Sequence, residues 1–105
     1  MYIVVLVTAK NVDEANKIAD GLVKDRLAAC VNVVKNIRSI FWWEGRVDNS
    51  DEALLILKSR KILLKKIIQK VKSLHSYQLP EIIALPIVDG SKDYLKWVDE
   101  STRSK

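Results

Sequence analysis

Apolar residues show two kinds of spacing along the chain, and each predicts a different kind of secondary structure. Some apolar runs are continuous and rich in β-branched residues, which is typical of strands, and the runs at 2–8 and 53–57 lack alternation, as in central strands buried on both faces. Elsewhere apolar residues recur every three or four positions, which predicts amphipathic helices. We therefore expect four strands, at 2–8, at 27–34 continued by 36–43 as one long arm, at 47–57 and at 82–88, and helices that begin after Asn11, Ser59 and Ser91.

The stretch 40–47 carries two adjacent tryptophans and a Glu44-Gly45 pair between two strand-like runs. A two-residue loop with Gly second suits the tip of a β-hairpin. The arms are longer than the usual strand of about 5 to 6 residues, so the tip should project beyond the domain and its tryptophans should need cover. The expected register pairs Trp42 with Val47, Arg38 with Asp51, Val33 with Ile56, and Val34 with Leu55.

Polar residues stand where the helices should begin. Asn11 precedes Glu14 by a capping-box spacing, and Ser59 and Ser91 are candidate caps for the other two helices. The apolar stripe of the first helix leaves Gly21 on the polar face, where glycine costs up to about 1 kcal/mol relative to Ala.

The second and third predicted helices each carry apolar residues whose expected positions can be stated. Ile62 lies within the lysine-rich face of the second helix and is a candidate subunit contact, and the helix should end near His75. In the last helix, Tyr94, Leu95, Trp97 and Val98 should lie on the buried side, and residues 101–105 should form a frayed tail.

The expected order is strand, helix, strand, strand, helix, strand, helix. It predicts an α+β chain with the ferredoxin-like βαββαβ sandwich, an extra C-terminal helix and a long projecting β-hairpin, all in one domain over 1–105. Pro86 cannot donate to a ladder, so we expect it at a sheet edge, a bulge or a subunit boundary.

Composition narrows the class of protein. Of 105 residues, 49% are hydrophobic and 30% are charged, which is ordinary for a globular protein, and the net charge of +5 permits weak attraction to polyanions. No apolar run approaches the length of a membrane span, and the start lacks a signal-peptide pattern, so we expect a cytoplasmic protein with no membrane partner. The single cysteine excludes an internal disulfide and a multi-cysteine zinc site within one subunit.

Candidate chemistry is sparse. The chain has one histidine, His75, and one thiol, Cys30, and it contains no nucleophile elbow and no glycine-rich phosphate loop, so we predict that it is not an enzyme. Cys30 can be a small packing residue or a metal ligand, and His75 can complement a helix C-terminus or accept a soft metal.

Several segments together resemble the CutA family of divalent-cation tolerance proteins. They are RLAACVN (26–32), WWEG (42–45), LKS (57–59), HSYQLPEI (75–82) and YLKW (94–97), and the likeness covers nearly the whole chain. The resemblance implies a homotrimer similar in assembly to PII signalling proteins, with copper or another divalent metal ion as the ligand.

The resemblance also implies roles for individual residues. Members implicated in copper binding carry a cysteine on the first strand and two adjacent histidines, and these positions match Val7, Leu74 and His75 here. We therefore predict metal binding at His75, with Cys30 and Glu81 as weaker candidates. The predicted trimer interface consists of Phe41, Trp42, Trp43 and Ile62.

Two other classes of function remain open from the sequence. The first alternative is an RNA-binding domain of RNA-recognition-motif topology, because such domains have the same order of strands and helices and an excess of basic residues. The central strands of this chain, however, lack the interleaved aromatic residues on which RNA bases stack. A hydrolase or transferase would need a site shared between subunits, where Tyr77, Arg26 and Glu81 could converge. The lysine-rich composition also suggests a thermostable protein.

Overall fold

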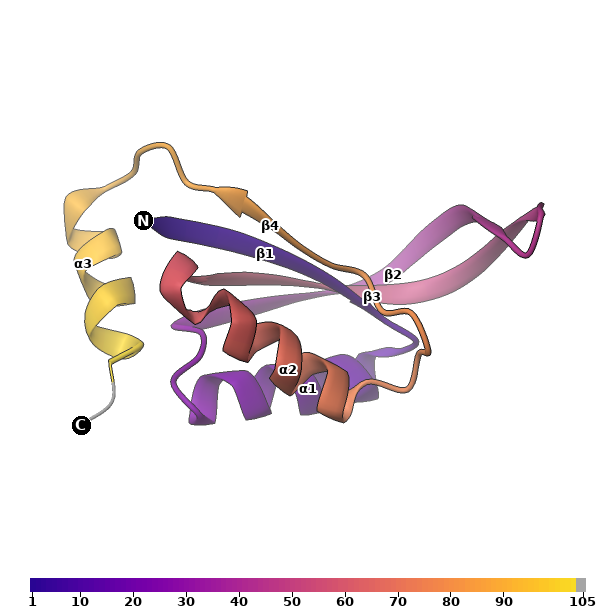
Figure 1. Cartoon of the computed structure of the whole chain (residues 1–105), viewed down its shortest axis with the longest axis horizontal. Coiled ribbons are helices and arrows are strands. Elements are labelled where there is room, and N and C mark those ends of the chain that lie inside the picture. The colour runs from indigo at the N-terminus through magenta and orange to yellow at the C-terminus, as the bar shows by residue number, and fades with distance from the viewer. Residues whose placement is uncertain (104–105) are drawn as a thin grey trace.

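The chain forms one antiparallel sheet with two helices on one face and a third helix at one end (Figure 1). The structure is a computed structural model, and it describes residues 1–103. The elements are β1 (Tyr2–Ala9), α1 (Val12–Lys24), β2 (Cys30–Trp43), β3 (Arg46–Arg60), a short 3₁₀ turn (Lys61–Leu63), α2 (Leu64–Leu74), β4 (Ile82–Pro86) and α3 (Lys92–Ser101).

The sheet has the order β2-β3-β1-β4, so β3 and β1 are central and β4 is an edge strand. This arrangement confirms the α+β, ferredoxin-like fold with an added C-terminal helix. Pro86 pairs with Ile3 at the outer end of β4, in agreement with the expected edge position. None of the helices in residues 1–103 is long and apolar enough to cross a membrane.

The core lies between the sheet and the paired helices α1 and α2 (Figure 1). Strand β1 alternates between buried and partly buried positions up to Val7, because only one of its two faces is covered within the chain. Residues 53–57 of β3 alternate in the same way, so the expectation that these two runs are buried on both faces fails for the single chain. The largest fully buried side chains of the core are Ile18 and Leu22 of α1, Leu55 and Leu57 of β3, and Ile67 of α2.

The hairpin leaves the body of the domain and ends in a free tip, so the molecule measures 44 × 26 × 23 Å (Figure 1). Near the tip the predicted register is confirmed, with Trp42 opposite Val47 and Arg38 opposite Asp51. Nearer the body it is wrong by one residue, because a bulge between Val34 and Ile37 shifts the pairing. There Val33 pairs with Leu55, and Val34 pairs with Leu54.

The bulge contains Asn36, whose φ of 59° lies in the left-handed region. Asparagine tolerates this region better than most residues, because its short polar side chain can bond locally. The sequence signal for the bulge is thus one asparagine within a long strand.

Two of the three predicted caps are confirmed. Asn11 Oδ1 accepts a hydrogen bond from the Glu14 amide at 2.9 Å, and the Ser91 hydroxyl accepts one from the Tyr94 amide at 3.4 Å. Ser59 is not a cap, because it lies in β3 with its side chain fully buried. Its hydroxyl instead donates to the Leu27 carbonyl at 2.6 Å, which ties the loop before β2 to the sheet.

Gly21 does not lie on a free polar face. It packs against α2, where an added Cβ would lie 3.0 Å from Leu74 Cδ1 and 3.3 Å from Lys70 Cε. The absence of a side chain at Gly21 therefore permits the close approach of the two helices. His75 ends α2 as predicted.

The C-terminal prediction is partly wrong. Thr102 is buried and caps α3, and its hydroxyl accepts a hydrogen bond from Arg60 Nε at 2.8 Å, so this part of the chain is docked rather than frayed. Residues 104 and 105 lie outside the described residues. Val98 is buried as expected, but Tyr94 and Trp97 remain 42% and 45% exposed on the single chain.

Candidate functional site

The face of the sheet away from α1 and α2 is mainly apolar, and within residues 1–103 only its Cys30 end has a neighbour from α3, which is Tyr94. We call it the open face. Most residues that alternate with the core positions are apolar, and the register places them in adjacent rows: Val4 and Leu6 of β1, Val34 of β2, Leu54 and Ile56 of β3, and Ile83 and Leu85 of β4. Polar residues of the same rows are Thr8, Asn32 and Lys58. An antiparallel sheet with one solvated face normally carries polar residues there, so this pattern indicates a second buried face.

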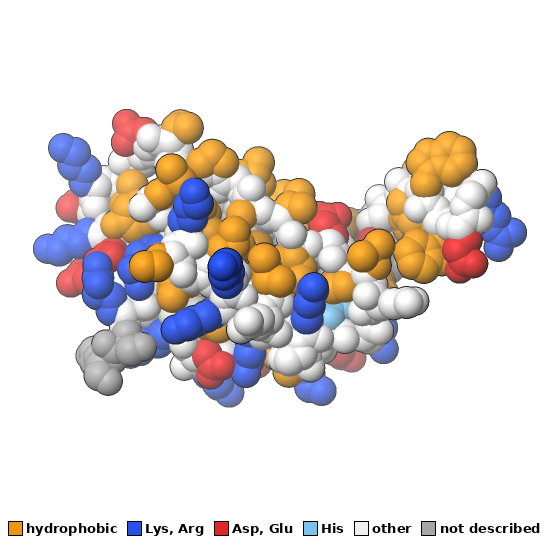
Figure 2. Space-filling view, in the orientation of Figure 1, with side chains coloured by type: hydrophobic (Ala, Val, Ile, Leu, Met, Phe, Trp, Pro, Cys, Tyr) orange, Lys and Arg blue, Asp and Glu red, His pale blue; other side chains and the backbone are white. Residues whose placement is uncertain are grey.

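The tip of the hairpin is a second uncovered apolar surface. Trp42 is 75% exposed, and Phe41 and Trp43 are exposed to 37% and 40%. Large hydrophobic side chains stand out near this tip in Figure 2, separated from the body of the domain. Ile62, on the lysine-rich side of the chain before α2, is 79% exposed. All four predicted interface residues are thus accessible in the single chain.

A polar cluster lies where the hairpin joins the body, and His75 is its centre. The side chain of His75 is fully buried, and its Nε2 lies 2.6 Å from the Thr8 carbonyl. Because a carbonyl oxygen only accepts, Nε2 carries the hydrogen, and in the neutral ring Nδ1 is an acceptor. Nδ1 accepts the Tyr77 amide at 3.0 Å, and Glu14 Oε1 lies 3.4 Å from the same nitrogen.

Tyr77 connects this cluster to the hairpin. Its hydroxyl donates to Glu52 Oε2 at 2.8 Å, and Glu52 lies in β3 beside the bulge and is 9% exposed. Burial and the adjacent Glu52 carboxylate raise the pKa of Tyr77 from 10.0 to about 12. The phenol therefore keeps its proton, and remains a donor to Glu52, throughout the neutral range.

The structure separates the three predicted metal ligands. Cys30 opens β2 opposite Lys58, which pairs with Val4, whereas His75 contacts Thr8 four residues further along β1. At about 3.3 Å per residue, these positions are roughly 13 Å apart. Glu81 is exposed just before β4.

Cys30 has neighbours of its own at the other end of the sheet. It is partly buried and lies near Tyr94. Burial, and after it the neighbouring Cys30, raises the pKa of the Tyr94 phenol. Residues 1–103 contain no group of three or more His, Cys, Asp or Glu side chains arranged to hold a metal ion.

Sequence reasoning missed Glu14 as a neighbour of His75. Its capping-box position in the first turn of α1 already explained its presence, and its amide does donate to Asn11 as that explanation requires. Its side chain, however, turns toward His75. The available signal was spacing, since Glu14 precedes the fully buried Ile18 by one helical turn and shares its inward face.

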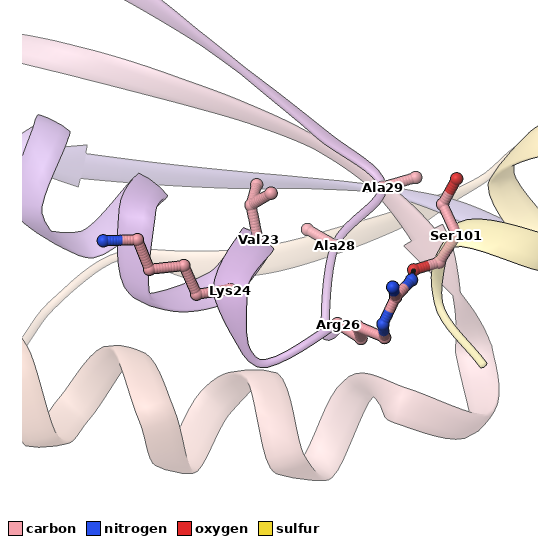
Figure 3. Close-up of a pocket in the computed structure, with 6 residues that line it drawn as sticks. All are labelled: Val23, Lys24, Arg26, Ala28, Ala29 and Ser101. Carbon is pink, nitrogen blue, oxygen red and sulfur yellow. Dashed lines mark hydrogen bonds between the residues drawn. The ribbon is translucent and has the colours of Figure 1, made fainter. Parts of the chain in front are cut away.

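A cavity of about 360 Å³ lies at the C-terminal end of α1. Lys24, Arg26 and Ser101 are among its lining residues (Figure 3). Arg26 adopts a φ of 57° and donates through Nη1 to the Ser101 carbonyl at 3.0 Å. Within one chain this places Arg26 against α3, whereas Tyr77 lies at the hairpin base. The two residues could meet only between subunits.

Comparison with known proteins shows what the chain is similar to. The sequence profile described as CutA1 divalent ion tolerance protein matches residues 3–101. Protein CutA 1, chloroplastic, from Oryza sativa is 46% identical over 96% of this chain and 57% of its own length. The divalent-cation tolerance protein CutA from Thermus thermophilus is 46% identical over 94% of this chain and 96% of its own length.

Solved structures agree with the sequence comparison. The divalent cation tolerance protein (Cut A1) from Thermus thermophilus superposes with a TM-score of 0.96 at 45% identity, over 98% of this chain and 100% of that one. The chain spans just over half the length of the two plant relatives, 57% for rice and 56% for Arabidopsis thaliana. The matched length and identity show that the chain belongs to the CutA1 divalent ion tolerance protein family.

Proposed function

We propose that the protein acts as a homotrimer that binds divalent metal ions and serves as a binding or scaffold protein rather than a catalyst. The open face carries this proposal. Its aliphatic rows cover both central strands and the edge strand β4, where Ile83 and Leu85 are 52% and 46% exposed on the single chain. A contiguous apolar surface of this kind on a folded chain marks an interaction site.

The hairpin supports a closed assembly of identical chains. Its tip, with Trp42 and Trp43, projects beyond the domain, so the tryptophans can be covered only by another molecule. In a cyclic assembly, each hairpin can lie on the next subunit while the sheets face a common axis, which covers both surfaces in every copy. Three copies is the number that the family resemblance suggests.

The metal part of the proposal rests on the family and on the donor atoms of the chain. The relatives are named for tolerance of divalent cations. Imidazole, thiolate and carboxylate side chains are ligands for copper and zinc, so His75, Cys30 and Glu81 stay candidate ligands. Of these, His75 has a further carboxylate, Glu14, beside its ring, which makes it the strongest candidate.

The RNA-binding hypothesis finds no support in the family match or in the relatives described above, which are CutA proteins. The centre of the open face also lacks rings on which bases could stack, because Val4, Leu6, Leu54 and Ile56 are aliphatic. We therefore retain the binding or scaffold function alone.

One chromatographic experiment tests the proposal. Untagged protein is incubated with Zn²⁺ or Cu²⁺, separated by size, and analysed in line by light scattering and elemental detection. We expect metal to elute with a species of three chains of 12.0 kDa each. A protein of 12.0 kDa, or an assembly that elutes without metal, would contradict the proposal.

A further inference from the structure

Lys58 is the only charged residue in the three rows of the open face that cross β1, β3 and β2. Its own row joins Val4, Lys58 and Cys30, and the polar members of the other two rows are Asn32 and Thr8. Lys58 is partly buried, and it forms no ion pair within the described part of the chain, 1–103. The open face therefore carries a positive charge that has no counter-charge among these residues.

Neutral oxygen atoms hold the ammonium group of Lys58 in place. Its Nζ donates to Oδ1 of Asn32 and, at 3.4 Å, to the carbonyl of Ile56. An ammonium group has three N–H donors, so one remains for a further acceptor. Because Oδ1 of Asn32 faces Lys58, the amide nitrogen of the same side chain offers two more N–H donors. Lys58 and Asn32 together present a positive charge and several hydrogen-bond donors.

This pair lies at the margin of the open face, where α3 adds aromatic side chains. β2 is an outer strand of the sheet, and Cys30 at its start lies near Tyr94 of α3 (Figure 1). The rings of Tyr94 and Trp97 pack with their centroids 5.5 Å apart, and both remain partly exposed. Burial, and after it Cys30, raises the pKa of the Tyr94 phenol, so this group adds no negative charge near Lys58 at neutral pH.

Cover of the open face would remove water from the Lys58 ammonium group. An unpaired charge is strongly unfavourable away from water, and a buried lysine is normally paired with an anionic group. In the proposed cyclic assembly every copy would bring the same charge toward a common axis, so repulsion between like charges would add to the cost. An anion bound at each Lys58 would offset both effects.

We propose that Lys58 and Asn32 form a binding site for the carboxylate of a small organic anion, whose apolar part packs against Tyr94 and Trp97. The inference rests on the proposed function as a binding protein, because cover of the open face is what makes Lys58 require an anion, and it adds a ligand class other than metal ions. A carboxylate suits the site because one oxygen can accept from Nζ of Lys58 and the other from the Asn32 amide. A carboxylate side chain of a neighbouring copy has the same chemistry, and the experiment separates it from a free anion.

Titration calorimetry of the untagged protein with benzoate tests the site, since benzoate carries a carboxylate on an apolar ring. Benzamide has a similar shape without the charge and is the matched control ligand. We expect saturable binding of benzoate to the wild type, and affinity weaker by about tenfold or more for benzamide and in Lys58→Met, because a hydrogen bond to a charged group is worth such a factor. Lys66→Met, which removes the same charge from the exposed side of α2, should bind benzoate like the wild type.

A second variant keeps the site testable if Lys58→Met fails to fold. Asn32→Asp places a carboxylate within hydrogen-bond reach of Lys58, so it should take the place of the ligand and abolish benzoate binding. In ¹⁵N-labelled wild-type protein, the side-chain amide resonances of Asn32 should shift on saturation with benzoate.

Equal benzoate affinity in wild type, Lys58→Met and Asn32→Asp, or unmoved Asn32 side-chain amides in saturated protein, would overturn the site and leave the proposed assembly intact. Wild-type protein that has the mass of three chains and binds no benzoate would also overturn it. If Lys58→Met then separates into single chains, the carboxylate belongs to a neighbouring copy. The mass of the wild type decides the proposed assembly separately, since benzoate binding can fail while that mass is unchanged.

Discussion

Replacing an apolar residue of the open face by a charged one should separate the subunits without unfolding them. Ile83 and Leu85 lie on the edge strand and are 52% and 46% exposed on the single chain. Full burial of such a side chain is worth about 1.5–3 kcal/mol, so covering the remaining half contributes about 1 kcal/mol per residue. For the two residues in three chains, this amounts to roughly 6 kcal/mol of the association free energy.

An aspartate at position 83 or 85 would remove the free energy gained by burying that apolar side chain on association. It would also place an unpaired charge in the interface, which costs several kcal/mol more. We expect Ile83→Asp and Leu85→Asp to sediment as single chains at micromolar concentration, while circular dichroism shows the wild-type content of helix and strand. Lys66→Asp, on the exposed side of α2, is the matched control and should keep the wild-type mass. Variants that fold and still sediment with the wild-type mass would refute the assignment of the open face to assembly.

Three further predictions concern the single chain. The pKa of Tyr77 is raised from 10.0 to about 12 in the folded protein, so this group should contribute up to about 2 kcal/mol of stability below pH 10, and the contribution should disappear as the pH rises toward 12. In urea titrations between pH 10 and pH 12, the free energy of unfolding of Tyr77→Phe should therefore depend less on pH than that of the wild type, and equal dependence would contradict this. Ser59→Ala should lower the free energy of unfolding by about 1–3 kcal/mol in urea titrations, since it removes a buried donor from the Leu27 carbonyl, and an unchanged midpoint would contradict this role. Asn36→Gly should be tolerated in thermal melts whereas Asn36→Val should lose about 1–2 kcal/mol, because φ at this position is 59°, and equal stabilities would show that the bulge relaxes.

Local patterns were sufficient to predict the elements of this fold. The turn at Glu44-Gly45 and the alternation near the tip led to the correct pairing of Trp42 with Val47. Asn11 and Ser91 were recognisable as caps because a cap depends on residues only three positions away. These features involve contacts between near neighbours in the chain, which the sequence displays directly.

The errors involve contacts between distant segments. Ser59 has the composition of a cap, but its hydroxyl bonds to Leu27 from within a strand. Thr102 belongs to a polar terminus, yet Arg60 of β3 holds it in place. Spacing alone could not reveal that either residue has a partner more than 30 positions away.

The candidate site was only half predictable for the same reason. His75 was singled out as the one histidine of the chain, but its neighbour Glu14 lies 61 positions earlier and already had a local explanation as a capping residue. Cys30 and Glu81 shared the chemistry of metal ligands, but the fold places Cys30 at the other end of the sheet from His75. The sequence shows which side chains could bind a metal ion, but the topology of the fold decides which of them lie near His75.

The mass of the native protein in solution tests the central claim most directly, because both the open face and the tryptophan tip require cover. Light scattering on untagged wild-type protein, diluted stepwise through the micromolar range, should give the mass of three chains of 12.0 kDa each at every concentration. A stable species of 12.0 kDa at micromolar concentration would contradict the account, since the exposed aromatic and aliphatic surfaces would then have no cover.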